Sequence, residues 1–528
     1  MKNNKSLVGI FLIFLLAIIL RLVPFEYLTR GSIDFGGNLM ISEASVPINQ
    51  IFKQVVCDQG PLRYYMLHFL LYFGRDEFLV RLPAFIFGVL SVLLVYYLGI
   101  FLFDKKVALL TSFLLSVSAW HIHHSLMVRN YTLFSFLVLG EVIFFLRSIK
   151  FNRVRDWIFF SLFTSLAFYA FYPSIFILFA EVLWFFFFVS GKRLFFRNIS
   201  TSLFIIILTF IPSIHKLNCA FYRKLNFGTG HWGWEGRTIF LELLNHFGGF
   251  KNFFPFYILI FIISICLLFY FKKMIKETIL LILLIIVPIF SYICCFYFFK
   301  MSIIARYFLY VYPFYLLIIS FAITRIKNIA LAVAAVSIFI FPLLTIFLAQ
   351  THSLNLEKYM PEDYRRHYVD YERIVSLIKD NYKSIDFVVI ESAPGIFGLQ
   401  YYFDKKNIYP VKSITPSLDS HRYYLYKNER IMLYGMDGDL PRLKRLAERG
   451  RLMVIDLGHI NYFNSGNEIL AWLKENSSKV DSDPGGEIYF IKYKQDEKQF
   501  PQMQYFDSDR FLDSKAEVKE IIYPFNRK

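Results

Sequence analysis

The residues whose types could most directly take part in chemistry are acids in a polar loop and arginines near helix ends. Residues 25–65 combine acids, glycines and aromatic residues between two apolar stretches. Arg129 and Arg306 each fall at the end of a predicted helix. A guanidinium gives planar, multi-donor contact with a phosphate, so both arginines are candidate phosphate binders. The competing interpretation is that a long side chain at a helix end only reaches the membrane interface, and we favour that interpretation for Arg21.

Composition indicates the class of protein that must position these residues. The chain has 528 residues, of which 56% are hydrophobic and 20% aromatic, and these values are typical of a polytopic membrane protein. The formal net charge of +17 is consistent with lysines and arginines that flank membrane spans. No basic, non-apolar segment stands out, which argues against nucleic-acid binding.

The apolar residues are concentrated in the first 350 positions, and charge returns after them. We therefore predict a transmembrane domain over residues 1–350 and a soluble domain over residues 351–528. About 20 apolar residues cross the hydrocarbon, which gives about eleven spans. They are expected near 7–24, 79–103, 107–122, 130–148, 157–172, 173–190, 200–215, 253–271, 277–299, 306–324 and 329–349.

Basic clusters in the short loops predict the orientation. If the spans alternate, six clusters fall on one side, which is then cytoplasmic and includes the N-terminus. The soluble domain and the first loop, residues 25–78, are then outside. The clusters are Lys2 with Lys5, Lys105 with Lys106, Arg147 to Arg155, Lys192 to Arg197, Lys272 to Lys276, and Arg325 with Lys327. The predicted location is the inner cell membrane.

The first outer loop ends in an amphipathic segment at residues 61–74. It is too short to span and begins with Pro61, so we predict a helix lying in the interface. In the tail, residues 371–378 and 440–450 predict helices, while 386–391 and 452–456 predict strands. This alternation is typical of a small α/β domain.

Cysteines and histidines provide no metal motif. Cys57 and Cys219 both fall in predicted outer loops, and the sequence leaves open whether they form a disulfide. His121, His123 and His124 have no acid beside them, and we interpret them as a polar turn at the interface. No cofactor is predicted with certainty, and a divalent metal has no supporting ligand motif.

Four segments, in order, resemble the GT-C superfamily of polytopic glycosyltransferases, especially the protein O-mannosyltransferases and the aminoarabinose transferases of lipid A. Residues 59–68 are similar to the family segment HPPLYYLLLH, and residues 76–88 to SEFxLRLPSALFG. Residues 120–131 are similar to HIYYSQEARMY, and residues 306–313 to RYLLPxLP. The resemblance implies an α-helical GT-C fold with interfacial helices in the first outer loop.

The resemblance also implies a function. Such enzymes move a sugar from a polyprenyl-phosphate donor to a glycolipid, polysaccharide or protein acceptor at the outer face. The family's Asp-Glu pair aligns near Phe35, where this chain has no such pair, and its later Glu aligns with Met127. The predicted catalytic residues are therefore Asp34, the nearest acid, and Asp58, which matches an Asp that often precedes the HPPL segment. Glu43 is a third candidate.

Substrate binding is expected at the other matched positions. Arg63 replaces an aromatic residue of the family segment, which adds a phosphate contact peculiar to this chain. The predicted substrate-binding residues are Arg63, Tyr64, His124, Arg129, Tyr131, Arg306 and Tyr307. Two alternatives stay open. One is a catalytically degenerate homologue that binds a lipid-linked glycan or a partner enzyme, and the other is a transporter, which predicts half-repeats or paired charges at mid-membrane.

Overall fold

The structure is a computed structural model in which the chain divides into two compact units. Unit 1 comprises Met1–Leu28, Val55–Met66 and Phe78–Arg366, and unit 2 comprises Thr29–Gln54, Leu67–Glu77 and His367–Lys528. The residues that it describes are 2–28, 33, 37, 40–41, 44–45, 47–54, 60–190, 195–214, 243, 245–247, 254–270, 274–299, 304–352, 371–381, 387–390, 423–425, 432–435, 440–448, 451–456, 466–483 and 486–491, with only the backbone described at some helix ends. Asp34, Asp58, Cys57 and Cys219 lie outside them.

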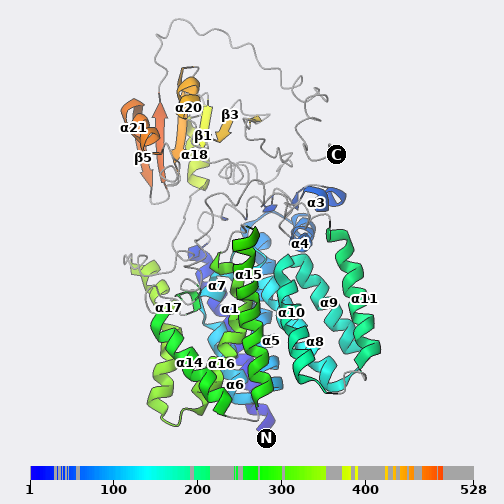
Figure 1. Ribbon diagram of the computed structural model, residues 1–528. Coiled ribbons are helices and arrows are strands. Elements are labelled where there is room, and N and C mark those ends of the chain that lie inside the picture. Colours follow the sequence, from blue (N-terminus) through cyan, green and yellow to red (C-terminus); the bar gives the residue numbers. More distant parts are fainter. Residues whose placement is uncertain are drawn as a thin grey trace, which may run out of the picture. The chain divides into compact units, whose positions relative to one another are not determined.

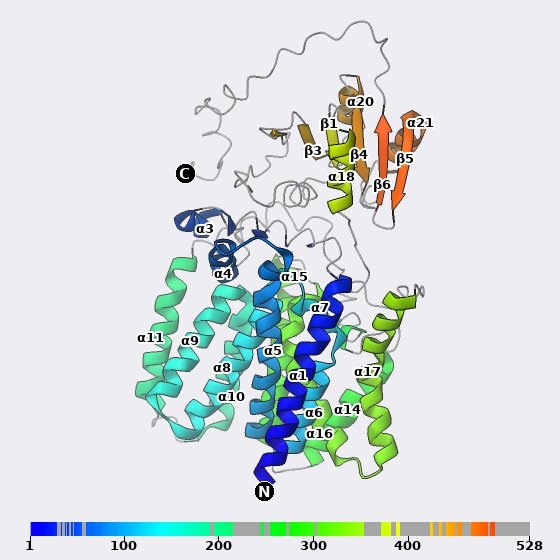
Figure 2. The same ribbon diagram turned by 180° about the vertical axis from the view of Figure 1, so that it is seen from behind.

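Unit 1 is a bundle of helices that stand side by side (Figures 1 and 2). They are α1 (Lys2–Leu28), α5 (Glu77–Leu102), α6 (Lys105–Ser116), α7 (Ala119–Ser125), α8 (Tyr131–Phe151), α9 (Val154–Ala170), η1 (Tyr172–Ser174), α10 (Ile175–Phe188), α11 (Phe196–Phe210), η3 (Ile211–Ser213), α14 (Phe254–Tyr270), α15 (Ile275–Phe299), η5 (Ala305–Val311), α16 (Tyr312–Arg325) and α17 (Ile329–His352).

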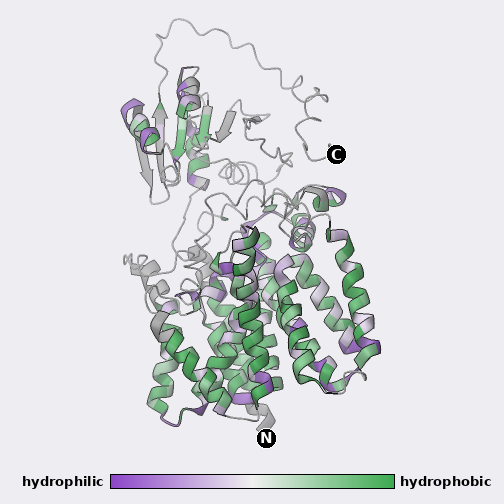
Figure 3. Cartoon of the chain, in the orientation of Figure 1, coloured by the Kyte–Doolittle hydropathy of each residue, from purple (hydrophilic) through white to green (hydrophobic). Residues whose placement is uncertain are grey.

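The apolar character of these helices explains why the unit is helical throughout its described part. A helix satisfies its own backbone hydrogen bonds, as a membrane environment requires. Among the described residues, five segments are long and apolar enough to cross a membrane, namely Glu77–Leu102, Tyr131–Phe151, Phe196–Ser213, Ile275–Cys295 and Ala305–Arg325. Figure 3 shows apolar residues along the lengths of these helices. The total number of spans stays a prediction.

The core of unit 1 lies around α16 and α8. Every residue from Tyr312 to Ile323 is buried, so α16 packs against neighbours on all of its sides. Pro313 occupies the first turn of α16, where its missing N–H has no helical partner to lose. The short 3₁₀ helix η5 precedes α16 and is also largely buried. This position holds the start of η5, with Arg306, firmly beside α8.

The span predicted at residues 107–122 is wrong, because this segment does not form a single helix. The helix α6 ends at Ser116, and α7 begins at Ala119 after Ser118 as N-cap. The Ser118 side chain accepts a hydrogen bond from the His121 backbone N–H at 3.3 Å. Serine is a preferred N-cap because its side-chain oxygen satisfies a backbone donor that has no helical partner. The break turns α7 into a separate short element.

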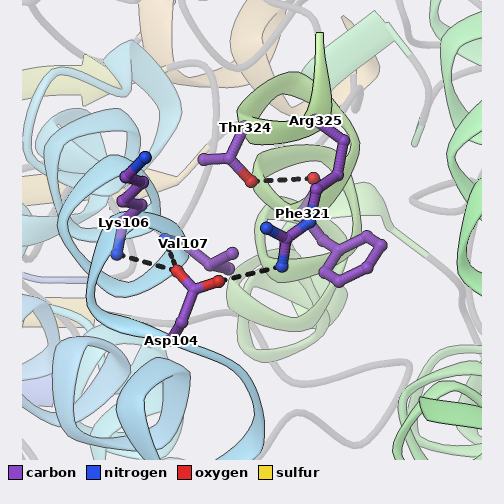
Figure 4. A network of polar contacts seen from close by, with 6 residues as sticks. All are labelled: Asp104, Lys106, Val107, Phe321, Thr324 and Arg325. Atoms are coloured by element: carbon purple, nitrogen blue, oxygen red, sulfur yellow. Dashed lines mark hydrogen bonds and ion pairs between the residues drawn. The ribbon is translucent and has the colours of Figure 1, made fainter. Parts of the chain in front are cut away.

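A polar network joins the turn before α6 to the end of α16 (Figure 4). Asp104 is the N-cap of α6, and its Oδ1 atom accepts from the backbone N–H groups of Lys106 and Val107 at 2.9 and 3.0 Å. Its Oδ2 atom accepts from Arg325 Nη2 at 2.9 Å. The Arg325 guanidinium also lies over the Phe321 ring, 4.8 Å from its centroid. One carboxylate thus caps one helix and holds another.

Three acids are buried in the described part of unit 1, and one of them is Asp156 on α9. Glu141 on α8 and Glu181 on α10 are both fully buried, and Thr164 on α9 donates a hydrogen bond to Glu141 Oε1 at 3.1 Å. Close by, Gly140 faces α9, and a Cβ placed there would lie 2.2 Å from the Phe163 ring. The glycine therefore permits α8 and α9 to approach closely at this level.

Unit 2 contains a six-stranded mixed sheet. The strands are β1 (Phe387–Ile390), β2 (Tyr423–Leu425), β3 (Met432–Gly435), β4 (Leu452–Asp456), β5 (Ser477–Asp483) and β6 (Gly486–Ile491), in the order β2-β3-β1-β4-β6-β5. β1 pairs in parallel with β3 and β4, with Val389 opposite Tyr434 and Val454, and the other pairings are antiparallel. The helices of this domain are α18 (Tyr371–Asn381), α20 (Leu440–Ala447) and α21 (Gly466–Asn476).

The tail folds as its pattern of apolar residues predicts. α18, β1, α20 and β4 occupy the four segments for which helix, strand, helix and strand are expected. The five residues of β4 are all buried, as in a strand covered on both faces. Leu443 of α20 and Leu473 of α21 pack with Val454 in one hydrophobic cluster.

The predicted interfacial helix is α4 (Leu62–Leu71), which begins after Pro61. Pro61 accepts the first hydrogen bonds of the helix from the backbone N–H groups of Tyr64 and Tyr65. The helix continues from unit 1 into unit 2, with Leu67 as the first residue of the latter. Unit 2 also includes α3 (Ile48–Gln54). In unit 2, His68 Nδ1 lies 2.7 Å from the backbone oxygen of Ala44.

Candidate functional site

Arg63 connects the start of α4 to the start of α8. Its Nη1 atom donates to Asn130 Oδ1 at 3.0 Å, and its Nη2 atom donates to the Tyr64 hydroxyl at 2.7 Å. Asn130 in turn donates from Nδ2 to the backbone oxygen of Ala170, at the end of α9, at 2.7 Å. Three elements that are distant in the sequence therefore meet at Asn130.

Gly60 makes this meeting sterically feasible. A Cβ atom at Gly60 would lie 2.2 Å from the backbone oxygen of Tyr169 and 2.8 Å from the carbonyl carbon of Ala170. These are backbone atoms, which cannot rotate aside as a side chain can. Only glycine lets the chain before α4 pass this close to the end of α9.

The N-terminus of α8 has no side-chain cap. Asn130 is the N-cap residue, but its side chain bonds Arg63 and Ala170 instead of the first-turn N–H groups. The first N–H groups of a helix lack helical partners, and the helix dipole adds partial positive charge there. This end of α8 therefore favours an anion, and Arg63 lies beside it.

Arg306 also contacts the start of α8. Its Nε atom donates to the Tyr131 hydroxyl at 3.1 Å. The Tyr131 and Tyr307 rings have centroids 6.4 Å apart, and Tyr307 also contacts Phe171, with ring centroids 5.6 Å apart. Tyr131 is buried, whereas Arg306 and Tyr307 are partly exposed. The guanidinium of Arg306 is thus held by Tyr131 in the first turn of α8.

The histidine segment packs beside Tyr131. The His124 ring lies edge-on to the Tyr131 ring at 5.1 Å, and Trp120 contacts Tyr312 at 5.6 Å. His121 and His124 are both fully buried. The prediction of a polar turn at the interface is therefore wrong: the segment forms the short helix α7, in which protein covers His121 and His124 while His123 is partly exposed.

The prediction that the Arg21 side chain reaches the membrane interface is also wrong. It is fully buried on α1 and does not extend to an interface. Its guanidinium donates to Ser125 Oγ at 3.1 Å, to the backbone oxygens of Ala17 and Ser116 at 2.9 and 3.4 Å, and to His121 Nδ1 at 2.8 Å. Acceptors on α6 and α7 hold the side chain inside the bundle.

Six of the predicted substrate-binding residues fall into two adjacent groups, joined by the consecutive residues Asn130 and Tyr131. Arg63 and Tyr64 form the first group, where the Arg63 guanidinium lies 4.6 Å from the Tyr64 ring centroid. The second group comprises His124, Tyr131, Arg306 and Tyr307. The seventh residue, Arg129, directly precedes Asn130 and is partly exposed. The catalytic roles of Asp34 and Asp58 stay predictions, because both residues lie outside the described part of the chain.

Two candidate functional residues, Asn130 and Gly60, are not predicted from the sequence. Asn130 bonds both Arg63 and the backbone of Ala170, but it is uncharged and so does not stand out in the sequence. Gly60 has no side chain that could indicate a function. A signal for Asn130 was available, since Asn before an apolar run is a preferred N-cap. The signal nevertheless misleads, because the Asn130 side chain does not cap α8.

The described residues contain no group of three or more His, Cys, Asp or Glu side chains arranged to hold a metal ion. One nitrogen of His121 is already occupied by Arg21. What the described geometry can do is bind an anion. It combines an uncapped helix end with the guanidinium groups of Arg63 and Arg306.

Known proteins share this sequence segment and this architecture. Residues 58–215 match the family model of the dolichyl-phosphate-mannose-protein mannosyltransferases. The comparison with curated proteins gives no match.

Among solved structures, ArnT from Cupriavidus metallidurans in the apo state has a TM-score of 0.57 at 11% identity, covering 93% of this chain and 98% of that one. The archaeal oligosaccharyltransferase AglB from Archaeoglobus fulgidus, in complex with an inhibitory peptide and a dolichol-phosphate, has a TM-score of 0.54 at 12% identity, covering 95% and 75%. ArnT from Cupriavidus metallidurans bound to undecaprenyl phosphate has a TM-score of 0.52 at 12% identity, covering 91% and 97%.

These similarities include the segment that carries Arg63, Asn130 and Tyr131, and they extend over nearly the whole chain. The predicted resemblance is confirmed: residues 58–215 match the mannosyltransferase family model, and the chain has the polytopic helical fold of ArnT and AglB.

Proposed function

We propose that the protein is a membrane glycosyltransferase that moves a sugar from a polyprenyl-phosphate donor to an acceptor at the outer face of the membrane. The observation that carries the proposal is the pairing of Arg306 with Tyr131 at the uncapped start of α8, with Arg63 beside it. The donor class is suggested by ArnT, which has been solved with undecaprenyl phosphate on the same fold.

The chemistry explains why cations should gather there. Transfer breaks the bond between the sugar C1 atom and a phosphate oxygen, and it forms a bond from C1 to an acceptor oxygen. Negative charge grows on the departing phosphate in the transition state, so fixed donors that stabilise it lower the barrier. The Arg63 and Arg306 guanidinium groups and the first-turn N–H groups of α8 have the right charge for this role.

The acceptor hydroxyl must lose its proton as the new bond forms. Asp34 and Asp58 are the proposed bases, because they are the acids of the first loop nearest to the positions that the superfamily pattern indicates. The aromatic rings of Tyr131 and Tyr307 are proposed to line the path of the donor. His124 supports Tyr131 by edge-on contact.

The proposed placement is in the inner cell membrane, with a cytoplasmic N-terminus. Lysines and arginines at one end of the bundle support it, including Lys106 and Arg325 in the network of Figure 4. The soluble domain, proposed as residues 351–528, would then be outside, where it binds the acceptor or covers the site. The acceptor class is a glycolipid, a polysaccharide or a protein.

A second function is a catalytically degenerate homologue that binds a lipid-linked glycan or a partner enzyme without transfer. The specific observation in its favour is the lack of an Asp-Glu pair near Phe35, together with Met127 in place of a Glu. This protein would keep the anion site and lose the reaction.

The test measures donor binding and sugar release separately. Purified full-length protein in nanodiscs is given a panel of radiolabelled polyprenyl-phosphate sugars, with and without acceptor extracts. The variants are Asp34→Asn, Asp58→Asn and Arg306→Ala. Arg325→Ala is the matched control, because it removes an arginine bonded to Asp104 at the far end of α16 from Arg306.

The proposal expects wild-type release that collapses in one Asp variant while donor binding survives. It also expects weaker donor binding in Arg306→Ala than in Arg325→Ala. Donor binding without release, for every sugar and acceptor, establishes the degenerate homologue instead. A wild-type protein that binds none of the donors refutes both functions.

A further inference from the structure

We infer that Arg21 of α1 is a positioning residue for the anion site, which it serves by clamping the short helix α7 in place. This inference rests on the proposed function for its catalytic consequence, but the clamp itself is a property of the fold. Arg21 has a place in none of the four segments that carry the family resemblance. It is nevertheless the largest charged side chain that is fully buried in the described bundle.

The clamp is made of hydrogen bonds from one guanidinium to three elements. Arg21 contacts its own helix at Ala17, the end of α6 at Ser116, and α7 at both His121 and Ser125. His121 and Ser125 are four residues apart, so they lie on the same face of α7. Figure 2 places α7 beside the later part of α1, in agreement with these bonds.

The bond to His121 specifies the state of that ring. An arginine side chain only donates hydrogen bonds, so Nδ1 of His121 must be the acceptor at 2.8 Å. The ring proton is then on Nε2, and the ring is neutral. The Ser125 hydroxyl is also committed, because it donates to the His121 backbone oxygen at 2.6 Å and accepts from Arg21 Nε at 3.1 Å.

A close approach of α5 completes the clamp. A Cβ atom at Gly88 would lie 2.2 Å from Ser125 Oγ and 3.5 Å from Arg21 Nε. Glycine at this position lets α5 cover the bonded pair and exclude other groups. Because Arg21 is fully buried, the hydrogen bonds of its guanidinium are stronger here than they would be in water.

A neighbouring position on α7 contacts the site, three residues after His121. His124 lies against the Tyr131 ring, and Tyr131 accepts the hydrogen bond of Arg306. A helix of seven residues is too short to be stable alone, so its position depends on such tertiary contacts. A continuous series of contacts therefore runs from Arg21 through α7 and Tyr131 to Arg306.

The first experiment is hydrogen exchange measured by mass spectrometry on the full chain in nanodiscs. The variants are Arg21→Lys, which keeps the charge but loses the forked donor geometry, and Ser125→Ala, which removes one acceptor. Arg147→Lys is the matched control, since Arg147 bonds Asp156 at the far end of α8. We expect about tenfold faster exchange in α7 for Arg21→Lys, a smaller increase for Ser125→Ala, and no change in α7 for Arg147→Lys.

The second experiment tests the connection to the site with a double-mutant cycle on donor affinity. Arg21→Lys and Tyr131→Phe are made singly and together, and dissociation constants for undecaprenyl phosphate are compared. If Arg21 acts through α7 on Tyr131, the double variant binds undecaprenyl phosphate as tightly as the single variant that has the lower affinity. A residue that only stabilises the fold gives additive losses.

The outcomes separate the inference from the proposed function. Unchanged exchange in α7, exchange raised equally in α9 and α16, or additive losses of affinity each overturn the positioning role of Arg21. Wild-type protein that fails to bind the lipid overturns the proposed function instead. In that case the exchange of α7 alone still decides whether the clamp exists.

Discussion

Replacing Gly60 with alanine tests whether the approach of the first loop to the end of α9 is required. The new Cβ atom would lie 2.2 Å from the Tyr169 backbone oxygen and 2.8 Å from the carbonyl carbon of Ala170. An ordinary carbon–oxygen contact is about 3.3 Å or longer, so the two backbones must separate by about 1 Å. Both partners are main chain, so no side-chain rotation relieves the clash.

The displacement has a calculable effect on Arg63, which follows Gly60 after Pro61 and Leu62. The bond from Arg63 Nη1 to Asn130 Oδ1 is 3.0 Å long, and a shift of about 1 Å stretches it beyond hydrogen-bonding distance. Overpacking of this kind costs about 1–3 kcal/mol of stability. Loss of the hydrogen bond from the charged Arg63 side chain removes a further ~1.5–3 kcal/mol of the free energy that holds Arg63 in its orientation. We therefore expect donor affinity to fall by about tenfold or more.

The assay is binding of radiolabelled undecaprenyl phosphate to full-length protein in nanodiscs, together with thermal unfolding. Gly9→Ala is the control, because its Cβ would meet only a flexible end of the Leu109 side chain, at 3.2 Å. Unchanged affinity and unchanged melting temperature in Gly60→Ala, within the scatter of Gly9→Ala, would refute the close approach and its role for Arg63.

Three further changes have expected outcomes. Tyr131→Phe removes the acceptor of Arg306 and should weaken donor binding about tenfold, measured by the same lipid titration, with little change in thermal unfolding. Asp104→Ala removes the cap of α6 and should cost about 1 kcal/mol, seen as a lower melting temperature with unchanged donor binding. Asp156→Asn breaks the bonded pair with Arg147, whose N···O distance is 3.0 Å, and should destabilise the α8–α9 pair, seen as faster local hydrogen exchange there and not in α16.

The helical part of the fold could be predicted because membrane spans are specified by local composition. Runs of about 20 apolar residues identify spans without knowledge of their neighbours. The break between α6 and α7 was missed because Val117 is apolar and the average over the segment stays high. Ser118 was the available signal, since a serine N-cap begins a helix.

The site could be predicted only as far as residue types indicate it. Arg306 was found because an arginine at the end of a predicted helix can bind a phosphate, and Arg63 because it replaces an aromatic residue of the family segment. The burial of Arg21 could not be predicted, because its acceptors on α7 are 100 and 104 positions away in the sequence. Asn130 and Gly60 matter through contacts with the end of α9, and no local pattern reveals such contacts.

The carboxylate of Asp104 also bears on the order in which the bundle is assembled during synthesis. Its Oδ1 atom serves backbone groups two and three residues away, so this cap is available as soon as α6 forms. Its Oδ2 atom waits for Arg325, 221 positions later, which is translated only after most of the bundle (Figure 4). Until then that oxygen lacks the Arg325 partner. The Asp104–Arg325 bond therefore forms only after α16 has packed against α6. Nascent chains of increasing length, held on stalled ribosomes, would show at which chain length the bond forms.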